Sequence, residues 1–386
     1  MSDDEPMDVS GPGGPGRGAG WHPDPWDPSK WRWWDGWAWT AHVSLRAKKP
    51  VTPAWLSIPV LIAMLFMVPW LIAALVSKPL VVLLAMVPLA IVVPVLLWLD
   101  RVEPEPKAEL VHSLLWGGTV AVLVGSLFND TVGALAGEGI AATISAPLGE
   151  EAMKALGILY AVRHRQLDGP MDGIVYAGWT AVGFAVVENV QYLSEAAQQG
   201  QLATVFVLRG LLSPFAHPLF TAWTGLAIGR AVARGRPVFP SMLWGYGLAV
   251  ASHALWNGST VAVGAFGDAA LGFLARTVLA FVGLFVVFAL VLYTTRRNEE
   301  RRFAQRVPWM VERYGLTAHE AVWFGNFKQM MASRKRLTAA QRKWFDRMHT
   351  ALARLALLHD RPGGADPQTE ELLLAQLQQA RFGTES

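Results

Sequence analysis

The feature that most constrains this chain is a series of long apolar runs separated by short polar junctions. Each run has about the 20 residues that a helix needs to cross a bilayer. Eight runs are expected to span the membrane, at residues 54–76, 79–99, 110–135, 139–162, 171–193, 202–230, 238–263 and 269–293. The sequence therefore predicts an all-α polytopic membrane protein with about eight transmembrane helices.

The composition agrees with a membrane protein. Of the 386 residues, 53% are hydrophobic and only 16% are charged, whereas soluble domains carry about 25% charged residues. The net charge of +3 is too small to indicate a nucleic-acid partner. The chain has no cysteine, which excludes disulfides, cysteine nucleophiles and cysteine zinc sites.

The positively charged residues predict the orientation. They cluster at every second junction, whereas the alternate junctions are nearly free of them, with Lys78 as the exception. The clusters are Arg46, Lys48 and Lys49; Arg101 and Lys107; Arg163 and Arg165; Arg230, Arg234 and Arg236; and Arg296 and Arg297. Because such junctions stay on the cytoplasmic side, we expect a multi-pass protein of the cell membrane with both termini in the cytoplasm.

Three segments flank the membrane domain, which is expected at 54–295. Residues 1–20 are rich in Gly and Pro and predict a disordered tether. Residues 21–50 alternate tryptophans around Asp35-Gly36, a hairpin turn signal, and predict a small β module. This Trp-rich segment resembles an N-terminal domain of unknown function found on many actinobacterial membrane proteins. One role considered for it is the binding of a protein partner. Residues 296–386 predict a helical cytoplasmic tail.

Four consecutive spans carry polar side chains that lipid does not tolerate. A charged side chain at the bilayer centre costs about 2.5–3.5 kcal/mol on insertion scales, so such residues face the bundle interior. They are Glu150, Glu151 and Lys154 in the fourth span; Glu188 and Asn189 in the fifth; His217 in the sixth, beside Pro214 and Pro218; and His253 and Asn257 in the seventh. We expect them to meet around one water-accessible cavity. Arg209 and Asn129 lie near the outer ends of their spans and are interpreted as interfacial.

Helical geometry separates the two carboxylates of the fourth span. Residues 150 and 154 lie about 40° apart on a helix, so Glu150 and Lys154 can pair. Glu151 points about 100° away from Glu150, and the two are expected to have different roles. An ion pair that only fixes helix packing is the alternative for this segment.

The motif set resembles that of the PrsW family of intramembrane proteases. The resemblance rests on Glu150-Glu151-x-x-Lys154, Phe184-x-x-x-Glu188-Asn189, the Pro214/His217 segment and His253-x-x-x-Asn257, and it covers roughly residues 80–295. The junction Glu103-Pro104-Glu105-Pro106 also matches. The wider group of CAAX prenyl endopeptidases has EExxxR and FxxxH, so Lys154 and Glu188 depart from its pattern. The resemblance implies an endopeptidase acting on a membrane protein such as a transmembrane anti-sigma factor.

The resemblance also implies catalytic roles. Glu150 would be the general base for a water molecule, while Glu151 pairs with Lys154 or a neighbouring helix, although the reverse assignment remains open. His253 and Asn257 would stabilise the oxyanion, and Glu188 and His217 would bind the water or protonate the leaving amine.

The sequence alone does not identify a cofactor. In the metal alternative, His217, His253 and one of the three glutamates would hold zinc. A transporter or channel that uses the buried carboxylates and histidines as a proton relay is the rival function. A non-catalytic scaffold is a third interpretation.

Overall fold

The computed structural model describes residues 20–23, 25–26, 30–34, 36–45, 57–164, 167–266, 271–314, 316–358 and 367–382. The chain divides into two compact units. One is Thr52–Glu299, and the other combines Met1–Val51 with Glu300–Ser386. The predicted tether at 1–20 lies outside the described residues, except for Gly20, which begins β1.

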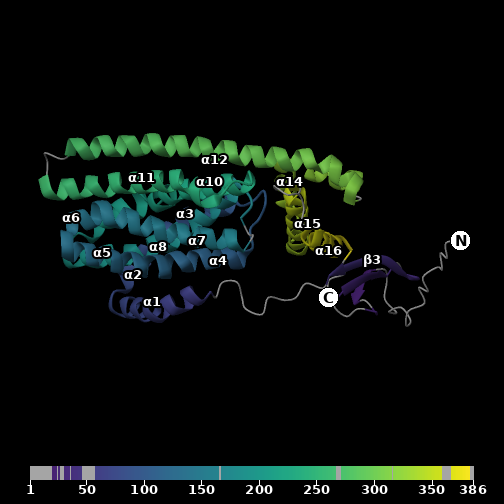
Figure 1. Ribbon diagram of the computed structural model, residues 1–386, viewed down its shortest axis with the longest axis horizontal. Coiled ribbons are helices and arrows are strands. Elements are labelled where there is room, and N and C mark those ends of the chain that lie inside the picture. The colour runs from purple at the N-terminus through teal and green to yellow at the C-terminus, as the bar shows by residue number, and fades with distance from the viewer. Residues whose placement is uncertain are drawn as a thin grey trace. The chain divides into compact units, whose positions relative to one another are not determined.

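The first unit is a bundle of helices that lie side by side (Figure 1). Its first half contains α1 Ile58–Ser77, α2 Pro79–Ala85, α3 Val87–Leu99, α4 Lys107–Trp116, η1 Gly117–Ala121, α5 Val122–Ala136, α6 Glu138–Ile140, η2 Ala141–Ser145 and α7 Ala146–Arg163. Its second half contains α8 Pro170–Gln198, α9 Leu202–Phe206, η3 Val207–Leu212, α10 Ala216–Ala233, α11 Val238–Phe266 and the beginning of α12 Leu271–Tyr314. The segments labelled η have π-helical hydrogen bonding.

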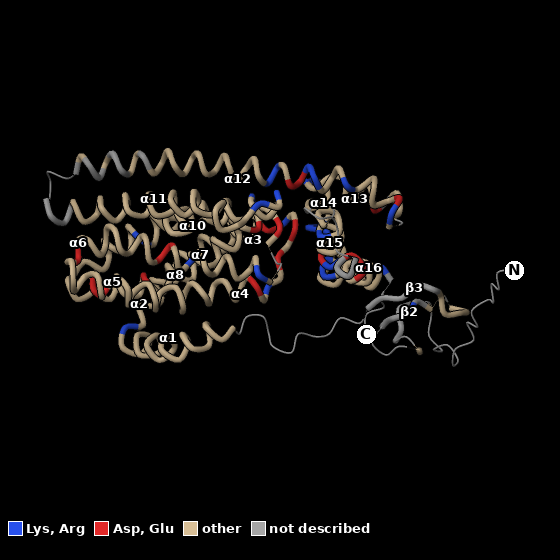
Figure 2. Tube along the Cα trace, viewed as in Figure 1, with Lys and Arg blue, Asp and Glu red and all other residues tan. Residues whose placement is uncertain are grey.

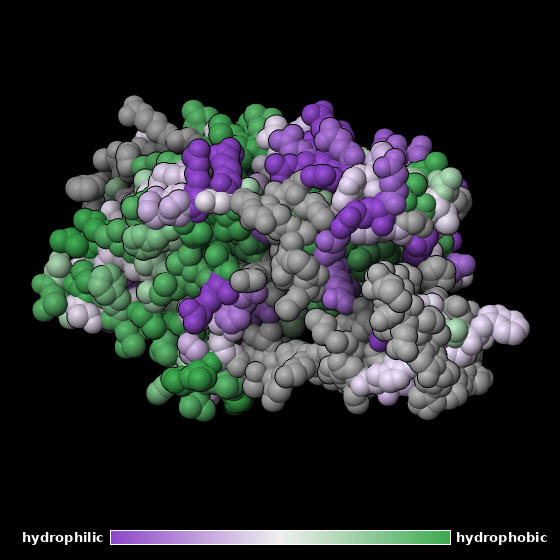
Figure 3. All heavy atoms as spheres, turned by 45° about the vertical axis from the view of Figure 1, so that its right-hand side comes forward, coloured by the Kyte–Doolittle hydropathy of each residue, from purple (hydrophilic) through white to green (hydrophobic). Residues whose placement is uncertain are grey.

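Among the described residues, six helical stretches are long and apolar enough to cross a membrane. They are Ile58–Ser77, Pro79–Leu99, Lys107–Ala136, Pro170–Gln198, Leu202–Ala233 and Phe281–Tyr314. Large apolar side chains such as Ile58, Leu65 and Leu212 are each 72% exposed, and Figure 3 shows such hydrophobic surface on the molecule. The prediction of a multi-pass membrane protein is therefore confirmed. The expected fourth and seventh spans are helical as α7 and α11, and their crossing remains a prediction.

Helix α8 is the centre of the bundle. It packs against α2, α3, α4, α7 and α10, and 94% of its most apolar stretch is buried. Glycines permit this packing, because a Cβ at Gly225 of α10 would lie 2.0 Å from the carbonyl oxygen of Gly173 of α8. Small residues at helix interfaces let backbones approach closely in membranes.

The sixth predicted span is broken. The π-helical segment η3 ends at Leu212, and α10 begins at Ala216. Pro214 lies between them and donates no backbone hydrogen bond. The break places His217 in the first turn of α10.

The described part of the second unit contains three strands and four helices besides the end of α12. Strands β1 Gly20–Pro23, β2 Lys30–Trp34 and β3 Trp39–Leu45 form an antiparallel sheet in the order β1-β2-β3. They lie in the segment for which the sequence predicts a β module. The helices are α13 Ala318–Phe324, α14 Phe327–Arg334, α15 Ala339–Leu358 and α16 Pro367–Phe382.

One predicted boundary differs from the structure. The sequence predicts that the last span ends at Tyr293 and that a helical tail begins at residue 296. Instead, α12 continues without a break to Tyr314. Residues 294–307 contain neither Gly nor Pro, so no helix breaker separates the apolar part from the charged part.

Candidate active site

The predicted polar side chains meet inside the bundle. Glu150, Glu151 and Lys154 come from α7, and Glu188 comes from α8. His217 comes from α10 and His253 from α11. All six are buried, and Glu151 and Lys154 are completely so. Four helices therefore bring their charged and imidazole groups to one place, as expected from the cost of exposing them to lipid.

Glu151 is the carboxylate with a full set of partners. Lys154 Nζ lies 2.9 Å from its Oε1 atom, and the Thr221 hydroxyl donates to Oε2 at 2.8 Å. His253 Nδ1 lies 3.2 Å from Oε1. Because these groups satisfy both oxygens, Glu151 fixes the positions of α7, α10 and α11 relative to one another.

Glu150 has a different environment. Its Oε1 atom accepts a hydrogen bond from Asn129 Nδ2 at 3.1 Å, and the Asn129 oxygen accepts one from the Ser145 hydroxyl. Its Oε2 atom is buried and has no hydrogen-bond partner among the described residues. That oxygen lies 3.7 Å from Lys154 Nζ and 4.0 Å from His253 Nε2. Of the two adjacent glutamates, Glu150 is therefore the one with a carboxylate oxygen available to coordinate an ion.

The hydrogen bonds determine the tautomer of His217. Its Nε2 atom lies 2.8 Å from Glu188 Oε2, and its Nδ1 atom lies 3.1 Å from Lys154 Nζ. A carboxylate only accepts and an ammonium only donates, so Nε2 carries the proton and Nδ1 has a lone pair. By the same argument His253 donates from Nδ1 to Glu151, which leaves Nε2 facing Glu150.

Arg209 belongs to this site, which corrects its interpretation as an interfacial residue. Its Nη2 atom forms an ion pair with Glu188, and its Nε atom donates to Asn189 Oδ1 at 2.8 Å. Asn129 is likewise a partner of Glu150 rather than an interfacial group. The available signal was Glu188 itself, because a buried carboxylate requires a cation.

Asn257 makes a different contact from the one expected. Its amide donates to the backbone carbonyl of Ala142 in η2 at 3.0 Å. This bond connects α11 to η2, one turn away from His253. A joint oxyanion site of His253 and Asn257 has no support from this contact.

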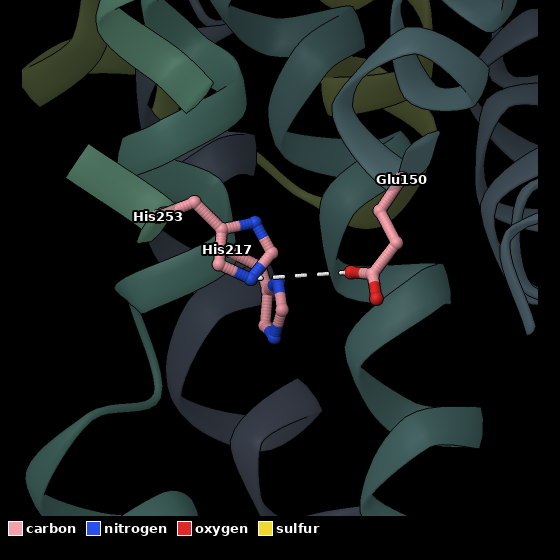
Figure 4. A group of neighbouring side chains, drawn as sticks. All are labelled: Glu150, His217 and His253. Carbon is pink, nitrogen blue, oxygen red and sulfur yellow. Dashed lines mark ion pairs between the residues drawn. The ribbon is translucent and has the colours of Figure 1, made fainter. Parts of the chain in front are cut away.

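Three side chains of the cluster form a set that can hold a metal ion. One ligand atom from each of Glu150, His217 and His253 lies within 4.8 Å of the others, and Figure 4 shows the three side chains converging. Two imidazoles and a carboxylate are the ligands of several catalytic zinc sites. The Oε2 atom of Glu150, which has no hydrogen-bond partner among the described residues, is available to bind such an ion. Each imidazole also has a carboxylate partner, Glu188 for His217 and Glu151 for His253, as metal-binding histidines usually do.

The local charge also fits a cation. Among the described residues, the three glutamates pair with two cations, Lys154 and Arg209. The net formal charge of these five groups is therefore −1 when both imidazoles are neutral. A divalent ion would compete with Lys154 for Nδ1 of His217, and Lys154 would keep Glu151 as its partner.

Comparison with known proteins identifies this region. Residues 105–294 match the family model described as PrsW family intramembrane metalloprotease. This part of the chain is similar to the PrsW family. The resemblance seen in the motifs is thereby confirmed. Residues 19–54 match a second family, described as a protein of unknown function (DUF2510).

Two curated proteins are similar to this chain. The chain is 34% identical over 139 residues to Protease PrsW of Geobacillus kaustophilus, a match that covers 34% of this chain and 58% of the relative. It is 30% identical over 151 residues to Protease PrsW of Clostridioides difficile, covering 36% of this chain and 63% of the relative. The match thus spans about 60% of the length of each relative. No solved structure matches the chain.

Proposed function

We propose that this protein is an intramembrane endopeptidase that hydrolyses a peptide bond of a membrane-protein substrate. The observation that carries the proposal is the buried cluster of Glu150, His217 and His253 inside the PrsW domain. A cluster of this kind is expensive in a membrane, and its ligand set suits hydrolysis. The names of the relatives support the same activity.

We further propose that Glu150, His217 and His253 hold Zn²⁺. A bound zinc ion polarises a carbonyl group and activates water for attack. The chain's own residues prepare this site. Glu151 holds His253 through Nδ1, and Glu188 holds His217 through Nε2, so each ring has a fixed tautomer. Lys154 keeps a positive charge beside the glutamate pair.

The surroundings of the site support a proposal for the substrate and the orientation. The cluster lies among lipid-facing helices, so a substrate with a transmembrane segment could reach it from the bilayer; by resemblance this would be an anti-sigma-factor-like protein. Lys and Arg gather at one end of the first unit (Figure 2). This pattern supports a cell-membrane protein with that end and both termini in the cytoplasm. The Trp-rich segment would bind a protein partner there.

The experiment compares membrane-protein fragments in cells that carry the wild-type chain or the Glu150→Gln variant. Fragments that appear only with the wild type identify the substrate, which is then reconstituted with the purified full-length protein. Chelation should abolish cleavage, and stoichiometric zinc should restore it. Cleavage that persists after metal removal but is lost in Glu150→Gln would contradict the zinc site. It would support Glu150 as the general base instead. Ion flux without cleavage would support the transporter instead.

A further inference from the structure

Arg209 has an unusual position for a cation. It lies on η3, whose apolar residues Val207, Leu208, Leu211 and Leu212 are between 42% and 72% exposed. These side chains face outward from the bundle, whereas Arg209 points inward. Its guanidinium group therefore enters the protein from a peripheral, lipid-facing segment.

The Arg209 guanidinium group contacts three residues of α8. Nη2 pairs with Glu188, Nε donates to Asn189, and the guanidinium carbon lies 4.0 Å from the centre of the Tyr192 ring. The planar guanidinium group can make these contacts at once because its donors have a fixed fork geometry. Arg209, which lies on η3, thus holds the Glu188 carboxylate of α8.

The same oxygen of Glu188 connects Arg209 to the cluster. Oε2 receives both Arg209 Nη2 and Nε2 of His217. A cavity of about 20 Å³ is lined by Arg209, His217 and Asn189 among others, which is room for about one water molecule. If the carboxylate rotated away, water could replace it at Nε2. The ring would then lose one of the two partners that fix its tautomer, and Lys154 at Nδ1 would be the other.

We propose that Arg209 is a positioning residue for His217, acting through Glu188. It holds the carboxylate on Nε2, so that Nδ1 keeps its lone pair directed at the side occupied by Glu150 and His253. This inference rests on the proposed function in so far as His217 is a metal ligand. Partners that orient a ligand histidine typically contribute about 10–100-fold to metal affinity.

The test uses the full-length protein in lipid bilayers with ¹⁵N-labelled histidine. Solid-state NMR reports which ring nitrogen of each histidine carries the proton, and the His217 signals are those lost in His217→Gln. The wild type should show His217 protonated at Nε2. Arg209→Met should give a mixture of tautomers and an about ten-fold weaker zinc affinity, measured by chelator competition. Arg209→Lys, which keeps the charge, should recover most of both.

Tyr192→Leu is the matched control, because it weakens the attachment of η3 to α8 without removing a partner of Glu188. It should leave the His217 tautomer and the zinc affinity within about two-fold of wild type. Arg209→Gln replaces Arg209→Met if the latter does not fold. In a double-mutant cycle, Arg209→Met should add little to Glu188→Gln, since both act through His217.

Two results separate this inference from the proposed function. An unchanged His217 tautomer and zinc affinity in Arg209→Met or Arg209→Gln would overturn the inference and leave Arg209 as a structural link only. A wild-type protein that binds no zinc would overturn the metal centre. The tautomer signal of His217 would still decide the role of Arg209 in that case.

Discussion

The Oε2 atom of Glu150 lies 4.0 Å from Nε2 of His253, while the adjacent Glu151 meets the other nitrogen of the same ring. One imidazole thus stands between two neighbouring carboxylates with unequal surroundings. Glu151 is saturated by Lys154, Thr221 and His253. Glu150 keeps one buried oxygen without a hydrogen bond among the described residues. This difference predicts that substitution of Glu150 affects activity, whereas substitution of Glu151 affects stability.

Glu150→Gln should lose activity rather than stability. Cleavage should fall by about 10²–10⁴-fold, the usual contribution of a group that handles protons or reacting atoms. The unfolding free energy should change by less than about 1 kcal/mol, because the amide oxygen of Gln can still accept from Asn129. Fragment assays and thermal unfolding of the purified protein measure the two effects. More than about a tenth of wild-type cleavage in the variant would contradict the prediction.

Glu151→Gln should instead destabilise the fold. Lys154 is completely buried and 2.9 Å from Glu151, and removing one partner of such a pair costs about 3–5 kcal/mol. The double variant Glu151→Gln/Lys154→Met removes the stranded charge and should recover part of this loss. Unfolding of both variants and of Glu150→Gln in the same detergent gives the comparison. Equal midpoints for Glu150→Gln and Glu151→Gln would show that the two environments do not differ in energy.

Asn129→Ala should reduce cleavage without unfolding the protein. The Asn129 amide orients Glu150 and is itself held by Ser145, and loss of a residue that orients a ligand costs about 10–100-fold. Zinc affinity should fall in parallel. Thr131→Ala is the control, since Thr131 is exposed and its hydroxyl donates to the Leu127 carbonyl of its own helix. A variant at Asn129 that matches this control would remove Asn129 from the site.

The convergence of Glu150, His217 and His253 follows from the sequence, because ionisable groups in apolar helices have to face the interior. The roles of Arg209 and Asn129 do not follow in the same way. Distance from a span's end gives a residue's depth in the membrane, but the direction of its side chain depends on how neighbouring helices pack. The π-helical segments η2 and η3 change that direction locally, and the expected 3.6-residue period cannot represent them.

The contact of Asn257 is also one that the sequence does not predict. Helical spacing places it on the same face as His253, as the sequence predicts. Its partner is nevertheless a backbone carbonyl in η2. A sequence does not show which backbone carbonyl will accept a hydrogen bond. Side-chain motifs therefore indicate which faces are polar, whereas backbone contacts decide which of those residues reach the site.

Gly225→Ala should push apart two helices that carry site residues. A Cβ at this position would lie 2.0 Å from the carbonyl oxygen of Gly173, so α8, which carries Glu188, must move away from α10, which carries His217. Overpacking of this kind costs about 1–3 kcal/mol. Gly247→Ala is the control, because nothing lies within 4 Å of its added Cβ. Thermal unfolding and cleavage should fall only in Gly225→Ala, and equal stability of the two variants would contradict the close packing.

Single cysteines can decide whether the chain crosses the membrane eight times or six, because it has no cysteine of its own. Gln199 and Arg234 lie at exposed ends of helices. Eight crossings from a cytoplasmic N-terminus place position 199 outside and position 234 inside. If only the six most apolar stretches crossed, both positions would be reversed, and Arg230, Arg234 and Arg236 would lie outside, against the positive-inside rule. A membrane-impermeant maleimide on intact cells should therefore label Gln199→Cys and leave Arg234→Cys unlabelled until the cells are opened. The opposite pattern would exclude α7 as a span, and with it the placement of Glu150 within the membrane.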